Sequence, residues 1–255
     1  FFPGALLIPV KQFYEIFDLL AGLEIDAAAV PVENSIEGSI NEIYDLLLDS
    51  KMKVTGEIFQ RINHCLIANV EREKLTKVYS HPQAIAQCRN YLRIKGLEPI
   101  PTYDTAAAVR MIKEKHFVDA GAIGSKRAAQ IYDMRIIEEG IQDRENNYTR
   151  FLILSNLETA PSGEDRTSLI FGLKHSPGAL FNVLKEFAIS NINLTKIESR
   201  PTKEKPWEYN FYVDIEGHAT QDNIKSVLLK IKGKCTFFKV IGSYKKGIVN
   251  QSSDF

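Results

Sequence analysis

Residues 30–39 read Val-Pro-Val-Glu-Asn-Ser-Ile-Glu-Gly-Ser, a polar stretch after an apolar run that could bind an anion. Asn34 with Glu37 three positions later is typical of a helix N-terminal cap. The same turn would direct backbone N–H groups and a side-chain amide beyond the end of a strand, which suits an anionic ligand. The residue types leave both interpretations open and favour the cap.

A second polar cluster, Ser-His-Pro-Gln, occupies residues 80–83 and is followed by Gln87. Ser80 and Gln83 match the S-x-x-Q capping pattern of a helix start. Gln87 lies one turn beyond Gln83, so both amides would share one helical face. His81 could act in acid–base or metal chemistry, but no second ligand stands at metal spacing, which favours a structural role.

Residues 146–151, Asn-Asn-Tyr-Thr-Arg-Phe, form a third polar cluster at the start of an apolar strand pattern. Such a run is usually a loop. However, the Thr149 hydroxyl, the Arg150 guanidinium and two amides could converge on a carboxylate at the strand entrance. Residues 121–126 superficially suggest a phosphate loop, but they lack its spacing and are interpreted as a strand-to-helix turn.

Two further segments lie in the last third of the chain. Ser-Pro-Gly-Ala-Leu at 176–180 is expected at a helix start, and Glu-Ser-Arg-Pro at 198–201 is expected at a strand end. Gly178 near a helix N-terminus would let a ligand or another chain approach the backbone closely. It could equally be a flexible cap.

The elements that must position these residues alternate between helical and strand patterns up to about residue 154, which predicts an α/β fold with a largely parallel sheet. The predicted helices cover 11–22, about 34–48, 105–115 and a segment from 125, and the predicted strands cover 25–32 and 119–123. Ile-Pro recurs at 8 and 100, and Asp-Ala at 26 and 119. This echo would indicate two similar lobes with a cleft between them, or it is chance.

The polar segment 158–166 contains Pro161 and Gly163 and is interpreted as a linker. The pattern after it predicts the order βαββαβ, a ferredoxin-like two-layer sandwich. Its predicted elements are strand 167–174, helix 176–190, strands 192–200 and 207–215, helix 220–231 and strand 235–244. The last residues are expected to form a loose tail.

The composition is that of an ordinary globular protein. The 255 residues carry 32 basic and 32 acidic side chains, and this balance argues against nucleic acid as the main partner. The three cysteines are far apart in the sequence, so they predict neither a disulfide framework nor a metal motif and favour a reducing cytoplasm. No apolar run is long enough to suggest a membrane span.

Taken in order, the clusters at 30–35, 80–83 and 148–151 resemble the signature of prephenate dehydratases. Residues 178–180 and 198–201 resemble the two phenylalanine-binding motifs of the ACT domain of that family. Three ordered matches are far more specific than one. The resemblance implies a reaction that needs no metal or organic cofactor.

The resemblance extends from about Gly4 to Lys246. It implies a catalytic domain of two periplasmic-binding-protein-like lobes at 1–157, the linker at 158–166, an ACT domain at 167–247 and a tail at 248–255. The family's glycine-rich opening stretch would precede Phe1. Because no methionine stands at position 1, we expect that a segment precedes the sequence.

The family's substrate, prephenate, loses CO₂ and water to give phenylpyruvate, and departure of the hydroxyl needs a proton donor. The resemblance makes Thr149 the group at that oxygen, polarised or supplied with a proton by Glu33, a relay that we state as a hypothesis. Arg150 would pair with a substrate carboxylate. The substrate-binding residues implied by the resemblance are Glu33, Asn34, Ser80, Gln87, Arg150 and Phe151.

The ACT resemblance implies feedback control by L-phenylalanine bound at a subunit interface, in a homodimer or homotetramer. The implied ligand-binding residues are Gly178, Ala179, Leu180, Glu198, Ser199, Arg200 and Pro201. An arogenate dehydratase shares these motifs and remains an alternative. A non-catalytic amino-acid sensor with a two-lobed body is the other alternative, which the Thr-Arg-Phe cluster speaks against.

Overall fold

The structure is a computed structural model that describes residues 2–202 and 207–249. The chain divides into two compact units, the first formed by Phe1–Gln60 with Thr149–Val249 and the second by Arg61–Tyr148. Phe1 and most of the predicted tail, 250–255, lie outside the described residues. The chain passes from the first unit to the second after Gln60 and returns at Thr149.

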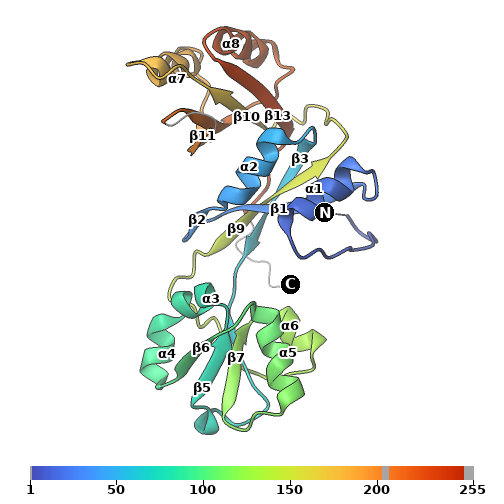
Figure 1. Ribbon diagram of the computed structural model, residues 1–255, viewed down its shortest axis with the longest axis vertical. Helices are drawn as coiled ribbons and strands as arrows, with labels where there is room; N and C mark the ends of the chain where they lie inside the picture. Colours follow the sequence, from blue (N-terminus) through green and yellow to red (C-terminus); the bar gives the residue numbers. More distant parts are fainter. Residues whose placement is uncertain (1, 203–206, 250–255) are drawn as a thin grey trace. The chain divides into compact units, whose positions relative to one another are not determined.

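The N-terminal part of the first unit contains a four-stranded sheet in the order β2-β1-β9-β3 (Figure 1). Its elements are α1 (Phe13–Ala21), β1 (Ala27–Asn34), β2 (Gly38–Ser39), α2 (Asn41–Asp49), β3 (Lys53–Arg61) and β9 (Tyr148–Ser155). β1 pairs antiparallel with both β2 and β9. The prediction of a largely parallel sheet is therefore wrong here, because a short turn joins β1 to β2 and β9 enters from the opposite end after the chain returns.

The second unit is a three-layer arrangement around a mixed five-stranded sheet, in the order β6-β5-β7-β4-β8 (Figure 1). β5 pairs parallel with β6 and β7, whereas β4 is antiparallel to β7 and β8. The elements are β4 (Cys65–Ile67), a 3₁₀ turn (Arg72–Lys74), β5 (Lys77–Ser80), α3 (Pro82–Gln87), α4 (Arg89–Lys95), β6 (Glu98–Pro101), α5 (Thr105–Lys115), β7 (Ala120–Gly124), α6 (Lys126–Ile131) and β8 (Ile136–Glu139).

Local capping explains why two predicted helices form where the sequence placed them. Asp104 accepts from the backbone N–H of Ala107 at 2.7 Å and starts α5, and Ser125 accepts from that of Ala128 at 3.1 Å and starts α6. The order helix, strand, helix occurs in both units as the sequence echo suggested, but residues 8–9 form no strand.

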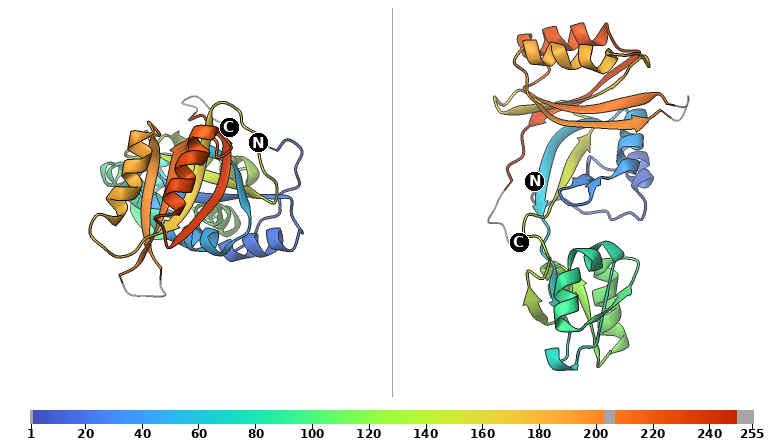
Figure 2. Two further views of the ribbon diagram at one scale, coloured as in Figure 1. Left: turned by 90° about the horizontal axis from the view of Figure 1, so that it is seen from above. Right: turned by 90° about the vertical axis from the view of Figure 1, so that its left-hand side faces the viewer.

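The C-terminal part of the first unit has the predicted βαββαβ order, and both of its helices cover one face of its sheet (Figure 2). The sheet order is β11-β12-β10-β13 and every pair is antiparallel. Its elements are β10 (Asp165–Gly172), α7 (Ala179–Ile189), β11 (Leu194–Pro201), β12 (Tyr209–Glu216), α8 (Asp222–Lys232) and β13 (Phe237–Lys245).

The other face of this C-terminal sheet packs on the N-terminal part of the same unit. Ile170, Tyr212, Ile241 and Tyr244 belong to one hydrophobic cluster with residues of α1, α2, β1, β3 and β9. All eight residues of β10 are buried, as expected of a strand covered on both faces. The segment predicted as a linker therefore joins two parts of one compact unit, and β10 begins within it at Asp165.

The cysteines are free thiols in this fold. Cys65 and Cys88 are buried, and burial raises the pKa of Cys88 to about 12 and that of Cys235 to about 11. These two thiols are protonated at neutral pH and are poor nucleophiles and metal ligands. Over the described part of the chain, no helix is long and apolar enough to cross a membrane.

Candidate active site

Asn34 and Thr149, which are 115 positions apart, are direct partners in the antiparallel pair of β1 and β9. The Asn34 side-chain N–H donates to the Thr149 hydroxyl at 3.1 Å. The Asn34 carbonyl oxygen accepts from the backbone N–H groups of Ile36 at 3.0 Å and Glu37 at 3.1 Å. Since only an oxygen can accept those two bonds, the amide orientation is fixed and its N–H faces Thr149.

This arrangement corrects the predicted helix start. Asn34 closes a turn between β1 and β2, and α2 begins only at Asn41 with Ile40 at its N-cap. The turn reverses the chain at Gly38, where φ is +84°, a conformation that favours glycine. The capping-box pattern correctly indicated that the Asn34 oxygen bonds backbone N–H groups, but those groups belong to a turn between strands.

The hydrogen bond from Asn34 also defines the chemistry that Thr149 can do. Because the hydroxyl oxygen accepts from Asn34, this bond does not use the hydroxyl hydrogen. A hydroxyl that accepts one hydrogen bond becomes a stronger donor in the next, since the two bonds polarise each other. Half-buried Thr149 is thus suited to donate to an oxygen that gains negative charge.

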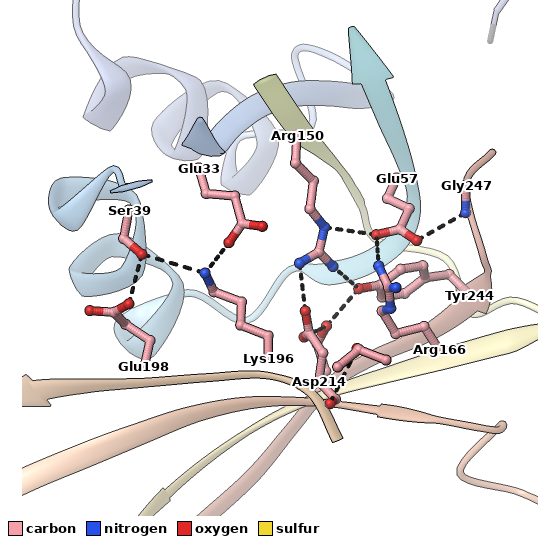
Figure 3. A network of polar contacts seen from close by, with 12 residues as sticks. Glu33, Ser39, Glu57, Arg150, Arg166, Lys196, Glu198, Asp214, Tyr244 and Gly247 are labelled. Carbon is pink, nitrogen blue, oxygen red and sulfur yellow. Dashed lines mark hydrogen bonds and ion pairs between the residues drawn. The ribbon is translucent and has the colours of Figure 1, made fainter. Parts of the chain in front are cut away.

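Glu33 does not support the proton relay that the sequence suggested. Adjacent residues of a strand face opposite sides of the sheet, and Glu33 lies on the opposite side from Asn34 and Thr149. Its carboxylate pairs with Lys196 of β11 instead (Figure 3). The relay hypothesis is wrong in this geometry, because strand alternation directs the carboxylate away from the hydroxyl.

Arg150 is also directed away from Thr149 and is not free to bind a substrate carboxylate. Its side chain is 5% exposed, and it donates to Glu57 at 2.7 Å and to Asp214 at 2.6 Å (Figure 3). A third bond joins it to the Tyr244 hydroxyl at 3.1 Å. Burial by itself would lower the pKa of Arg150, but Asp214, Tyr244 and Glu57 raise it above its ordinary value.

The ion-pair cluster around Arg150 contains a second cation, Arg166. Arg166 donates to Glu57 at 2.5 Å, so two arginines and two carboxylates balance each other in a buried site. Glu57 also accepts from the backbone N–H of Gly247 at 2.9 Å. Removing one member of such a cluster leaves an uncompensated buried charge, which costs about 3–5 kcal/mol. Arg150 is therefore a structural cation, and its side chain lies on the face of β9 opposite to Thr149.

Ser80 ends β5 in the second unit and is completely buried. Its hydroxyl donates to the backbone oxygen of Ile123 in β7 at 2.8 Å. The predicted Ser80 cap is wrong, because His81 occupies the N-cap and its ring nitrogen accepts from the backbone N–H of Gln83 at 3.2 Å. The structural interpretation of His81 is confirmed.

Gln87, at the end of α3, is held by Asn147, one of the two amides of the 146–151 cluster, and by His64, which lies outside the polar clusters of the sequence. Its side-chain oxygen accepts from His64 Nε2 at 2.8 Å and from the Asn147 amide at 2.9 Å. Both partners are buried, at 7% and 0% exposure. Burial lowers the pKa of His64 although its bond to Gln87 raises it, so the ring is neutral at pH 7 and carries its proton on Nε2. No local pattern around His64 signalled this contact.

The predicted regulatory segment 178–180 begins α7. Gly178 is the N-cap, and its φ of +79° favours glycine. Ala179 and Leu180 lie in the first turn of the helix and line a cavity of about 170 Å³. The cavity is further lined by the aromatic residues Trp207, Tyr209 and Phe211.

The second predicted regulatory segment, 198–201, lies at the end of β11 and its residues alternate between two faces. Glu198 and Arg200 are half-buried, whereas Ser199 and Pro201 are exposed. Glu198 accepts from the Ser39 hydroxyl at 2.7 Å, and Arg200 pairs with Asp45 at 3.2 Å. The two charged residues of this segment therefore contact the N-terminal part of the unit.

The fold and site define a class of protein in which an α/β body with paired Asn and Thr side chains on adjacent strands is followed by a βαββαβ module. Comparison with known families agrees with this class. The family model for prephenate dehydratase matches residues 1–159, and that for the ACT domain matches residues 167–233. The chain belongs to the prephenate dehydratase family and carries an ACT domain, as its motifs predicted.

Relatives in three groups of organisms have similar sequences. A bifunctional chorismate mutase/prephenate dehydratase of Aquifex aeolicus is 41% identical over 95% of this chain and 67% of its own length. Arogenate dehydratase 2 of Petunia hybrida is 40% identical over 95% of this chain and 66% of its own length. The chain thus spans about two thirds of these two relatives. The prephenate dehydratase of Methanocaldococcus jannaschii is 40% identical, over 92% of this chain and 86% of its own length.

Two solved structures resemble most of the chain. A prephenate dehydratase from Arthrobacter aurescens in complex with L-Phe has a TM-score of 0.85 and 29% identity, and the match covers 93% of this chain and 80% of that one. A quorum quenching acylase has a TM-score of 0.88 and 28% identity, over 96% of this chain and 90% of that one. The predicted fold class, an α/β body followed by an ACT domain, is confirmed.

Proposed function

We propose that this protein converts prephenate to phenylpyruvate, CO₂ and water, and that L-phenylalanine inhibits it through the ACT domain. The observation that carries the proposal is the hydrogen bond from Asn34 to Thr149, which leaves the threonine hydroxyl hydrogen available to a leaving oxygen. Membership of the prephenate dehydratase family supports the substrate, because the matched family model covers all three motifs, at 30–35, 80–83 and 148–151.

The reaction needs one proton donor. The bond between the ring carbon and its carboxylate breaks, its electron pair moves into the ring, and the bond from the opposite ring carbon to its hydroxyl breaks. The products are an aromatic ring, CO₂ and hydroxide, which becomes water when it gains a proton. A donor at the leaving oxygen is typically worth about 10²–10⁴-fold in rate. Thr149, polarised by Asn34, fits that role.

The other predicted residues divide into two kinds. We propose that Asn34 and Gln87 hold substrate by neutral hydrogen bonds, with Gln87 oriented by His64 and Asn147, and that the predicted substrate residue Ser80, which is buried, supports this site through its bond to the Ile123 carbonyl. Phe151 remains a predicted substrate contact from the resemblance. Glu33 and Arg150 would instead support the strands that carry Asn34 and Thr149.

We further propose that L-phenylalanine binds beside Gly178, Ala179 and Leu180, where the aromatic lining of the neighbouring cavity suits its ring. In this proposal Ser199 and Pro201, with Glu198 and Arg200 on the same strand, complete the site in a homodimer or homotetramer. A cytoplasmic location is part of the same proposal.

The test is to incubate the purified protein with prephenate and to measure phenylpyruvate by its ultraviolet absorbance in alkali. We expect turnover in the intact protein, and a loss of about 10²–10⁴-fold in kcat for Thr149→Val, because the donor is removed while the shape is kept. Thr149→Ser, which keeps the hydroxyl, is the matched control and should retain most of the activity. Unchanged kcat in the valine variant would exclude Thr149 as the donor.

The same preparation separates the alternatives. Faster turnover of arogenate than of prephenate would make the protein an arogenate dehydratase, an activity named for one relative. Binding of either compound without product would make it a sensor. The likeness to a quorum quenching acylase adds one more substrate class to assay, an acylated signalling molecule.

A further inference from the structure

Lys196 is a half-buried lysine of β11 whose ammonium group contacts three different elements of the N-terminal part. It donates to the Glu33 carboxylate of β1 and lies 3.4 Å from the Ser39 hydroxyl of β2 (Figure 3). It also lies over the ring of Tyr44 in α2, 5.4 Å from the ring centroid. β1 leads into the turn closed by Asn34, and β2 and α2 follow that turn in the chain.

These contacts are stronger than those of an ordinary surface ion pair. The Lys196 side chain is 14% exposed and the Glu33 side chain 31%, so both charges have lost much of their water. A desolvated charge is costly unless it is paired and hydrogen-bonded. A cation over an aromatic ring is attracted to it further, and this attraction is stronger at a desolvated site. The position of the ammonium group therefore restrains β1, β2 and α2 together.

The contacts of Lys196 continue along the same face of β11. Glu198 accepts from the Ser39 hydroxyl, and Arg200 pairs with Asp45 of α2. Three alternate residues of one edge strand thus bind the segment that follows Asn34. The predicted phenylalanine-binding residues include two of these three, so a ligand that displaces Glu198 or Arg200 would also move Ser39 and Asp45.

We propose that Lys196 is a positioning residue that holds the Asn34 turn in its active conformation, and that β11 transmits phenylalanine binding to this turn through Lys196. The inference rests on the proposed function. Lys196 would act through Asn34 and not through contact with substrate, because its ammonium group lies on the face of β1 that Glu33 occupies.

The variants that test it are Lys196→Met, which keeps the side-chain length and removes the charge, and Lys196→Arg, which keeps the charge. Lys234→Met is the matched control, because Lys234 also forms an ion pair within the ACT domain, with Glu186 of α7, on the side of the helices. Each variant is assayed for kcat and KM with and without phenylalanine. Calorimetry then measures phenylalanine binding, and thermal melting checks the fold.

In the intact protein phenylalanine should change kcat/KM by about 5–150-fold, the usual range of coupling between two sites. We expect Lys196→Met to lower kcat/KM about fivefold or more and to reduce the effect of phenylalanine to less than about twofold. Its phenylalanine Kd should stay within about threefold of that of the intact protein. Lys196→Arg should recover part of both losses, and Lys234→Met should behave as the intact protein.

The inference would be overturned if Lys196→Met matched the Lys234→Met control both in turnover and in the change of kcat/KM that phenylalanine causes. A loss of phenylalanine binding would also overturn it, because Lys196 would then belong to the ligand site. If Lys196→Met does not fold, Ser39→Ala, which removes the shared partner of Lys196 and Glu198 without removing a charge, must show the same weakened response. An intact protein without dehydratase activity would contradict the proposed function and not the positioning role.

Discussion

At the scale of single residues, hydrogen-bond direction decides what the site can do. The backbone N–H groups of Ile36 and Glu37 hold the oxygen of the Asn34 amide and thereby direct its N–H to Thr149. A carboxylate of the same size would still accept from both backbone groups. It would, however, accept from Thr149 as well, and so take the hydrogen that the leaving oxygen needs.

Asn34→Asp is therefore expected to lower kcat/KM by about 10²–10³-fold with only a small change in the free energy of unfolding. Steady-state assays and urea denaturation measure the two quantities. The comparison is with Asn34→Ser, which is a weaker acceptor for the turn but carries no charge. An aspartate variant with full turnover would show that the direction of this hydrogen bond does not matter.

His64 gives the second prediction at this scale, through the pH dependence of stability. Its folded-state pKa is lowered by burial, so between that pKa and about 6.5, the ordinary value of histidine, the unfolded chain binds more protons than the folded one. The free energy of unfolding then rises with pH in this window, and it falls as the pH drops below about 6.5.

His64→Gln keeps a donor for Gln87 and cannot be protonated. We expect a smaller loss of stability in this variant than in the intact protein when urea denaturation at pH 7.5 is compared with pH 5.5. His64→Leu, which lacks the donor, should in addition have a raised KM because Gln87 is no longer oriented. Equal pH dependence in all three proteins would mean that His64 does not titrate differently on folding.

At the scale of elements, α2 depends on a cation from another part of the chain. No basic residue lies in its last turn. Instead Lys239 of β13 donates to the backbone oxygens of Leu47 at 3.1 Å, Leu48 at 2.8 Å and Ser50. A cation at this end of a helix satisfies carbonyl groups that have no partner within the helix and interacts favourably with the helix dipole.

Lys239→Met should lower the free energy of unfolding by about 1–2 kcal/mol, the range for a charged partner at a helix terminus. Urea denaturation measures the change. Lys245→Met, on the same strand but with an exposed side chain, is the control and should lie within about 0.5 kcal/mol of the intact protein. The same loss in both variants would assign the effect to the strand and not to the cap.

At the scale of the whole molecule, the ACT domain completes the core of the catalytic part. One hydrophobic cluster contains Leu152 and Val54 together with Ile170, Tyr212 and Tyr244 of the ACT sheet. The buried charges also join the two parts, since Arg150 and Glu57 pair with each other and with Asp214 of β12 and Arg166 of β10. Removal of the domain would expose the apolar face and leave Arg150 and Glu57 as a single pair without their other partners.

For a chain that ends after Leu157, we therefore expect a free energy of unfolding several kcal/mol lower than that of the intact chain. The loss arises because apolar burial is reduced and the ion-pair cluster is broken. It should also bind a hydrophobic dye and give no response to phenylalanine. Thermal melting, dye fluorescence and the dehydratase assay provide the measurements. A fragment as stable as the intact chain would show that the two parts fold independently.

Much of the fold could be predicted because its signals are local. Asp104 and Ser125 cap α5 and α6 where the sequence placed these helices, and the ACT module follows the predicted order of strands and helices. The parallel sheet was predicted wrongly in the first unit, because strand direction depends on where β9 returns in space. The start of α2 was misplaced because Asn34 and Glu37 form a turn whose pattern resembles a helix cap.

The sequence by itself determined the family, since three motifs in a fixed order are specific without any coordinates, and it determined most helices, whose caps and periodicity lie within a few residues. Only the tertiary structure decided the direction of each side chain. Strand alternation places Thr149 with Asn34 and sends Glu33 and Arg150 to the opposite face, where Lys196, Asp214 and Glu57 bind them. Contacts between residues so distant in the chain arise from packing, and no local pattern encodes them.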